Sequence, residues 1–130
     1  MKIHHIGYLV KSIEKAEKCF LKLGYKVVQK KTYDKYREIN IVFLSKDGHL
    51  IELVAPVSAD SVVTGLYKRM KNSPYHICYE TDDFNDELTL LTENGFVQIG
   101  EPCVAPAIQN RRVCFLMSSS IGLIEILEKE

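Results

Sequence analysis

The feature that most constrains this chain is an internal repeat. His-Ile-Gly-Tyr at residues 5–8 recurs as His-Ile-Cys-Tyr at residues 76–79, and Leu-Ile-Glu-Leu at 50–53 recurs as Leu-Ile-Glu-Ile at 123–126. The matches stay in register with only a residue or two of drift, which chance does not explain. Such self-similarity indicates two copies of one supersecondary unit, each too small to bury its own apolar face.

Both copies predict the same order of elements. In the first, Ser12 is suited to cap a helix whose apolar residues follow at helical spacing, and Gly24 is suited to end it. Asp83 and Gly95 take these places in the second copy. An Asp-Gly turn at residues 47–48 predicts a hairpin. The predicted strands cover residues 5–10, 25–30, 39–45, 49–54, 75–81, 96–99, 112–117 and 123–128.

The fold class that follows is α+β, with two tandem βαβββ modules. We expect one domain over residues 1–130, with module 1 at about 1–56, a connector at about 57–73 and module 2 at about 74–130. Side by side, the two modules would bury more apolar surface and form a cupped mixed sheet. Apolar residues of the connector predict a short amphipathic helix that covers part of the core.

Four residues at equivalent places in the two copies are the candidate site: His5, Glu52, His76 and Glu125. Each glutamate interrupts an apolar strand, where a lone carboxylate would carry a desolvation cost. Two imidazoles and two carboxylates that chelate a divalent cation remove that cost and suit a borderline metal. For any one of the four residues, the alternative to metal binding is a purely structural role. A glutamate would then lie on the polar side of its strand, and a histidine would have its hydrogen bonds satisfied by ordinary partners.

The motifs around these residues resemble the vicinal-oxygen-chelate superfamily. They are His-Ile-Gly-x-x-Val at 5–10, Ile-Glu-Leu at 51–53, Tyr-His-Ile-x-Tyr-Glu at 75–80 and Gly-Leu-Ile-Glu-Ile-Leu at 122–127. The resemblance covers essentially the whole chain. It implies the glyoxalase/bleomycin resistance/dioxygenase fold and a divalent metal held by the four residues, nickel or zinc first, with cobalt or manganese as alternatives.

The resemblance also implies an activity. The first expectation is a lactoylglutathione lyase (glyoxalase I) type of enzyme, in which Glu125 moves a proton on an enediolate and Glu52 is its partner. The alternatives are a methylmalonyl-CoA epimerase-like enzyme and a non-catalytic small-molecule-binding protein. The epimerases carry a separate catalytic glutamate before the third strand, and Glu38 is the nearest carboxylate here. Arg111 and Arg112 suit either an anion clamp or a solvated loop end.

Net charge and cysteine content limit the kinds of binding partner and the compartment that we expect for this chain. Lys plus Arg and Asp plus Glu each number 17, so the net charge of zero is a poor match for a nucleic acid or an anionic membrane. No C-x-x-C pair occurs among the four cysteines, which predicts reduced thiols and a cytoplasmic protein. We therefore expect a small-molecule substrate, no nucleic acid or membrane partner, and a homodimer.

Overall fold

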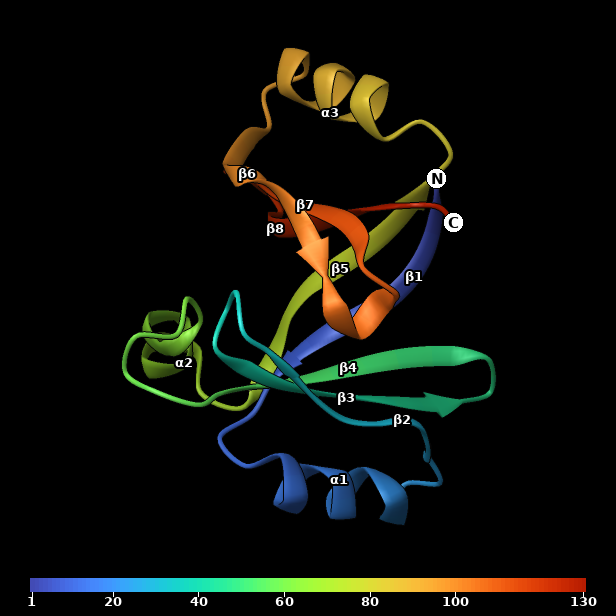
Figure 1. Ribbon diagram of the computed structural model, residues 1–130, viewed down its shortest axis with the longest axis vertical. Coiled ribbons are helices and arrows are strands. Elements are labelled where there is room, and N and C mark those ends of the chain that lie inside the picture. The colour runs from blue at the N-terminus through green and yellow to red at the C-terminus, as the bar shows by residue number, and fades with distance from the viewer. The chain divides into compact units, whose positions relative to one another are not determined.

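The computed structural model describes residues 1–130 and contains two βαβββ modules with a short helix between them. The predicted α+β class and repeated element order are confirmed (Figure 1). The elements are β1 (Lys2–Leu9), α1 (Ile13–Lys22), β2 (Lys26–Asp34), β3 (Ile39–Lys46), β4 (His49–Pro56), α2 (Thr64–Met70), β5 (Ser73–Thr81), α3 (Phe84–Glu93), β6 (Val97–Ala105), the 3₁₀ helix η1 (Pro106–Ile108), β7 (Arg111–Ser118) and β8 (Gly122–Glu128).

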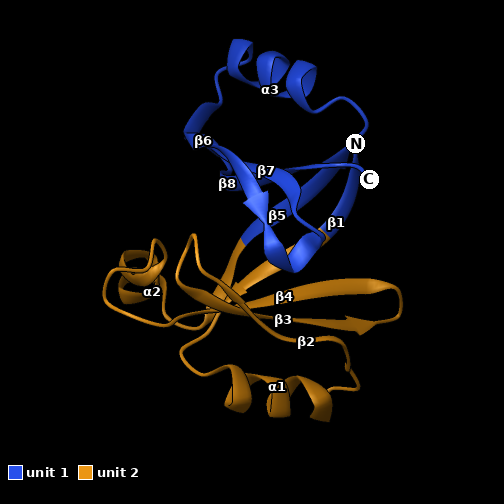
Figure 2. Ribbon diagram, in the orientation of Figure 1, with its two compact units in different colours: residues 1–4, 76–130 blue, residues 5–75 orange.

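The chain divides into two compact units (Figure 2). One unit comprises residues 5–75, and the other comprises residues 1–4 with 76–130. Within residues 5–75 the strand order is β2-β3-β4-β1, with β1 parallel to β4 and the other neighbours antiparallel. The other unit has the matching order β6-β7-β8-β5, with β5 parallel to β8. The two units thus contain mixed sheets with the same strand order and the same strand directions.

Local sequence explains the turns of the first module. The Ser12 hydroxyl accepts a hydrogen bond from the Lys15 amide at 3.2 Å, which satisfies one of the free amides at the start of α1. Gly24 has a φ of +95° just after this helix, a conformation that favours glycine. Asp47 and Gly48 both have positive φ, as a tight two-residue hairpin turn requires. These predicted signals are confirmed.

In each unit a helix covers one face of the sheet, α1 in one and α3 in the other (Figure 1). Alternate strand residues point to this helix, since successive side chains of a strand face opposite sides. The core under α1 consists of Val10, Ile13, Val42, Leu44, Ile51, Leu53 and Ala55. The core under α3 consists of Phe84, Leu88, Cys114, Leu116, Ile124 and Ile126. The residues between them in sequence face the opposite side of each sheet.

Three details differ from the sequence prediction. The strands β2 and β6 are longer than predicted, because irregularities in their pairing let them continue past the polar residues that suggested loops. No residue of α2 is fully buried, although Leu66 and Tyr67 are half-buried and Val63 just before the helix is buried. The Asp83 side chain makes no cap at α3; instead the Thr81 hydroxyl accepts a hydrogen bond from the Asp83 amide at 3.2 Å.

No helix of this chain combines the length and the apolar character that crossing a membrane requires.

Candidate metal centre

The first candidate pair, His5 and Glu52, comes from two adjacent parallel strands. Nε2 of His5 lies 3.5 Å from Oε1 of Glu52, and their side chains are 0% and 7% exposed. Ile51 and Leu53 are buried under α1, so the glutamate between them faces the other side of the sheet. The same alternation that builds the core therefore delivers a carboxylate to the histidine.

An aromatic ring holds the first pair in place. Phe43 on β3 is the cross-strand partner of Glu52, and its ring meets the His5 imidazole edge-on, with the centroids 5.3 Å apart and an interplanar angle of 84°. Edge-to-face contacts of this kind are favourable and restrict how the rings can turn. The imidazole is thus oriented with Nε2 toward the carboxylate.

The second pair, His76 and Glu125, repeats this construction. Nε2 of His76 lies 3.5 Å from Oε1 of Glu125, with side chains 0% and 6% exposed. Phe115 is the cross-strand partner of Glu125 and meets the His76 ring edge-on at 5.1 Å and 88°. The position opposite the glutamate on the parallel neighbour strand holds Cys78, where the first pair has Gly7.

The donor chemistry of both pairs fits a divalent metal ion. Each contributes an imidazole nitrogen and a carboxylate oxygen that point at each other from buried positions. Nitrogen and oxygen donors of this kind suit zinc, nickel, cobalt and manganese. A pair supplies only two donors, fewer than the three or four protein ligands of typical catalytic metal sites. Neither pair is therefore a complete protein ligand set on its own.

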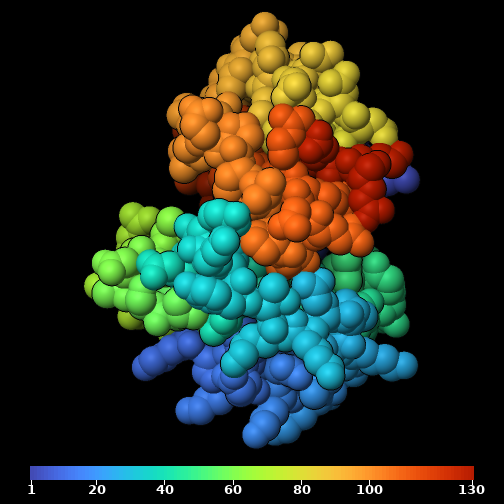
Figure 3. All heavy atoms as spheres, viewed as in Figure 1, coloured from blue at the N-terminus to red at the C-terminus, as the bar shows by residue number.

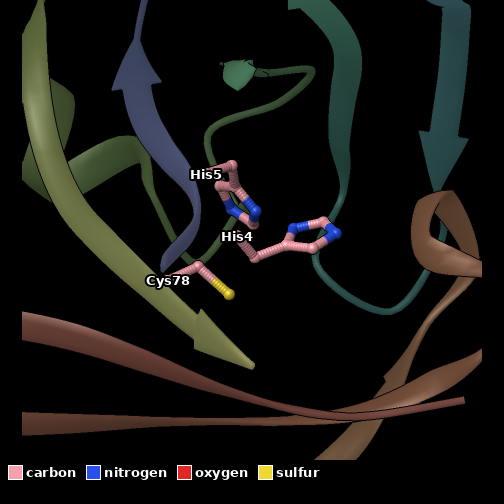
Figure 4. Close-up of side chains that lie close together, drawn as sticks. All are labelled: His4, His5 and Cys78. Carbon is pink, nitrogen blue, oxygen red and sulfur yellow. The ribbon is translucent and has the colours of Figure 1, made fainter. Parts of the chain in front are cut away.

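His4 and Cys78 form a further contact within the second unit. One ring nitrogen of His4 lies within 4.8 Å of the sulfur of Cys78 (Figure 4). His4 is half-buried and Cys78 is fully buried. His49, by contrast, is exposed.

The two arginines after η1 do not form an anion clamp. Arg111 binds the Glu80 carboxylate and donates from Nε to the Glu128 carbonyl at 2.6 Å. Arg112 makes two hydrogen bonds to the Glu128 carboxylate, at 2.9 and 2.7 Å, and its guanidinium lies over the Phe84 ring. This pairing lowers the pKa of Glu128 and raises that of Arg112. Both cations are engaged in holding strands together.

Sequence reasoning overlooked the roles of Phe43 and Phe115. They occupy equivalent places in the repeat, and that equivalence was a usable signal, because each lies between its histidine and its glutamate at intervals that differ by one residue between the copies. Glu38 is the carboxylate whose position in the sequence comes nearest to that expected for the separate catalytic glutamate of epimerases. It lies in the turn before β3, has a φ of 53° and is half-buried. The structure does not join it to either pair by a hydrogen bond from its side chain.

Two tandem βαβββ modules with a buried His–Glu pair in each define the vicinal-oxygen-chelate class of fold. The model of the Glyoxalase/Bleomycin resistance protein/Dioxygenase superfamily matches residues 4–115. This chain belongs to that superfamily.

Individual relatives and solved structures are similar to this chain over most of its length. Mitochondrial methylmalonyl-CoA epimerase of Bos taurus is 28% identical over 130 residues, which covers 96% of this chain and 73% of the relative. Among solved structures, a hypothetical protein of Bacillus halodurans matches with a TM-score of 0.88 and 26% identity, covering 99% of this chain and 94% of the other. Methylmalonyl-CoA epimerase of Mycobacterium tuberculosis has the same fold, with a TM-score of 0.86, 21% identity and coverages of 99% and 88%.

Proposed function

We propose that this protein is a metal-dependent epimerase that inverts the carbon next to the carbonyl of a branched acyl-CoA thioester, with methylmalonyl-CoA as the first candidate substrate. The observation that carries the proposal is the presence of two matching buried His–Glu pairs in a chain whose relatives include methylmalonyl-CoA epimerases. The similarity favours this alternative over the lactoylglutathione lyase that the sequence motifs first suggested.

We propose further that His5, Glu52, His76 and Glu125 together hold one divalent ion. Support comes from the donor types, from their burial and from the incompleteness of each pair alone. Nickel, zinc, cobalt and manganese are all compatible with two nitrogens and two oxygens. When bound, such an ion polarises the thioester carbonyl and so acidifies the carbon beside it.

Inversion at one carbon requires a proton to leave from one face and another to arrive at the opposite face. The C–H electron pair passes into the thioester carbonyl as a carboxylate takes the proton, and it returns to carbon when a proton is delivered from the other side. We assign removal to Glu125 and the partner role to Glu52. Glu52 would deliver its proton from the opposite face, and between turnovers Glu125 would lose the proton it took to solvent while Glu52 takes one up, so the reaction carries solvent hydrogen to the inverted carbon.

Proton exchange with solvent tests this function. Holoprotein is incubated with one stereoisomer of methylmalonyl-CoA in D₂O, and mass spectrometry follows deuterium at the inverted carbon. Incorporation should accompany racemisation and stop when chelator removes the metal. In a parallel assay, the hemithioacetal of methylglyoxal and glutathione should not be isomerised. Turnover of the hemithioacetal without exchange in the thioester would overturn the proposal in favour of the lyase.

We propose further that this protein is located in the cytoplasm and that it forms a homodimer. All four cysteines are free thiols in the structure, which agrees with a reducing compartment. Light scattering of the purified chain should give twice the 14.9 kDa protomer mass. A monomer mass across the micromolar range would remove the dimer from the account.

A further inference from the structure

The turn between β2 and β3 and the short helix α2 form one surface of the unit of residues 5–75. We propose that this turn–α2 surface, made of Lys35, Tyr36, Lys68, Arg69 and Lys71, binds the phosphorylated nucleotide end of a coenzyme A thioester. The proposal rests on the proposed function and names the part of the substrate that this surface recognises.

Hydrogen bonds tie the turn to the segment that leads into α2. The Arg37 carbonyl accepts hydrogen bonds from the Ser61 hydroxyl at 2.9 Å and from the Val62 amide at 3.4 Å. The Glu38 carbonyl accepts one from the Val57 amide at 3.0 Å. Within this unit the turn and α2 lie side by side (Figures 1 and 3). Residues far apart in sequence therefore contribute to one surface.

A buried carboxylate makes the turn rigid. Asp34 is 1% exposed, and it accepts hydrogen bonds from the amides of Tyr36 and Arg37 at 2.9 and 3.1 Å. It also pairs with the Arg37 guanidinium at 2.7 Å. The next residue, Glu38, is held at a φ of 53°, which is unfavourable for a non-glycine residue. The turn is thus fixed before any ligand binds, which lowers the entropic cost of binding.

The exposed groups on this surface suit a purine and phosphates. The Tyr36 ring is 56% exposed, and the Lys35 ammonium lies over it at 5.3 Å from the centroid. An exposed ring beside a cation offers stacking to a base and charge to a phosphate. Lys68, Arg69 and Lys71 are all exposed on or after α2.

The local charge is distinctly positive in a chain that is neutral overall. The turn and the segment of α2 contain the acidic residues Glu38 and Asp60 besides the paired Asp34, against four cations, Lys35, Lys68, Arg69 and Lys71. Arg37 is excluded from this set because Asp34 already neutralises it. A concentration of cations on a neutral protein attracts a polyanion and steers its approach.

The separation from the first pair fits a long substrate. Phe43 and Glu52 are cross-strand partners beside His5, and Ile39 and Pro56 are partners at the turn–α2 end of the same two strands. Four residues of strand correspond to about 13 Å. A coenzyme A thioester has its acyl group and its nucleotide at opposite ends of a pantetheine arm. The acyl group can therefore lie at the metal centre while the nucleotide lies on the turn–α2 surface.

Binding of coenzyme A and its fragments tests the inference. Calorimetry with holoprotein should show coenzyme A binding more tightly than pantetheine, which lacks the nucleotide. The double variant Lys68→Glu/Arg69→Glu should bind coenzyme A about tenfold or more weakly, a fold-change typical of one or two lost charge contacts. Pantetheine binding should not change. The matched control is Lys15→Glu/Lys18→Glu, which makes the same charge change on the exposed face of α1.

Tyr36 separates stacking from charge. Tyr36→Ala should weaken coenzyme A binding several-fold, while Tyr36→Phe keeps the ring and should bind as the wild type. In the exchange assay, the charge variant should raise KM for methylmalonyl-CoA and leave kcat unchanged. If both charge variants weaken coenzyme A equally, or if pantetheine binds as tightly as coenzyme A, the surface is not the nucleotide site. A wild type that binds coenzyme A through this surface but exchanges no thioester proton would refute the proposed function alone.

Discussion

The two His–Glu pairs of this protein are nearly identical in geometry. Each has an imidazole nitrogen 3.5 Å from a carboxylate oxygen and a phenylalanine edge-on to the imidazole. They differ at the residue opposite the glutamate, which is Gly7 in the first pair and Cys78 in the second. They differ also in the cores behind them, where Val42 and Cys114 take equivalent places.

Residues that recur in both copies can be distinguished from residues that differ between them, and the two groups indicate which positions serve function and which serve packing. The donors and the aromatic ring recur in both copies, together with apolar residues of the strands such as Ile51 and its counterpart Ile124. The neighbouring positions changed size and polarity without moving the donors apart. We infer that the pairs are constrained by a shared ligand, whereas Cys78 and Cys114 are constrained only by the space they fill. Variants that damage one pair or make the pairs more alike test this distinction.

The largest effect is expected from the histidines. His5→Ala and His76→Ala should each abolish binding of the metal by the whole protein, because each deletes a nitrogen donor from a site with four protein ligands. Elemental analysis after supplementation with nickel, cobalt or zinc measures this directly. His49→Ala is the control, since this exposed histidine should leave metal content at the wild-type level. Loss of half the metal in either variant would show two independent sites.

The glutamates should differ in turnover more than in metal content. Glu125→Gln keeps the shape and one oxygen donor but loses basicity, so much of the metal should remain. Turnover should fall by roughly 10²- to 10⁴-fold, the scale of a positioned acid–base group. Glu52→Gln should cost less. Rates of deuterium exchange into the thioester, compared at equal metal occupancy, measure both. Equal losses would contradict the assignment of the principal base to Glu125.

The aromatic rings should have a moderate effect. Phe43→Leu and Phe115→Leu preserve apolar volume but remove the edge-on contact with the imidazole. An aromatic pair contributes about 0.5–1.5 kcal/mol beyond its buried area, so metal affinity should weaken by about two- to twelvefold. Competition with a chromophoric chelator gives the affinity. Unchanged affinity in both variants would mean that the histidines need no such support.

Cys78 tests whether sulfur belongs to the metal centre. Cys78→Ala should leave metal content unchanged and cost about 1 kcal/mol of unfolding free energy, as expected for a small truncation in a packed region. Chemical denaturation and elemental analysis of the same preparation give both quantities. A sharp loss of metal in this variant would make the thiol a ligand and would replace the proposed nitrogen and oxygen set.

The smallest effect concerns Cys114, the counterpart of Val42. Burial raises the pKa of its thiol to about 11, from an ordinary value of 9.0. The unfolded chain therefore loses this proton at a lower pH than the folded one, and stability falls as the pH rises from about 9 to about 11. Cys114→Val should reduce that slope when unfolding is measured across this range. An identical pH dependence in both proteins would show that the thiol is not responsible.

Much of this structure could be predicted from the sequence because the repeat supplies two views of one pattern. The repeat placed Glu52 and Glu125 in equivalent strands, and Gly24 and Asp47-Gly48 marked real turns. The engagement of Arg111 by Glu80 could not be predicted, since it depends on how separate strands pair. The hydroxyl of Thr81, in place of Asp83, at the start of α3 also depends on side-chain geometry that the pattern does not encode.

The activity was the least predictable part. The motifs at 5–10, 51–53 and 122–127 contain donors that several enzymes of the superfamily share. They favoured a lyase, whereas the similarity to methylmalonyl-CoA epimerases favours the alternative. In our proposal, substrate choice depends on groups at a distance from the donors, namely those of the turn–α2 surface. The features of that surface that bear on the substrate are its positive charge and its exposed side chains. Residues distant in sequence contribute to it because hydrogen bonds of Asp34 and Ser61 order the turn and link it to the segment before α2.

The stoichiometry of metal binding tests the central claim most directly. The account predicts that titration of metal-free protein with Co²⁺, followed by its visible absorption, saturates at one ion per chain. The two matching pairs would then share a single ion, and the spectrum would show no sulfur-to-metal charge transfer. Saturation at two ions per chain would mean that each His–Glu pair binds its own ion, and no binding at all would leave the two pairs as buried structural contacts. Either result would contradict the account.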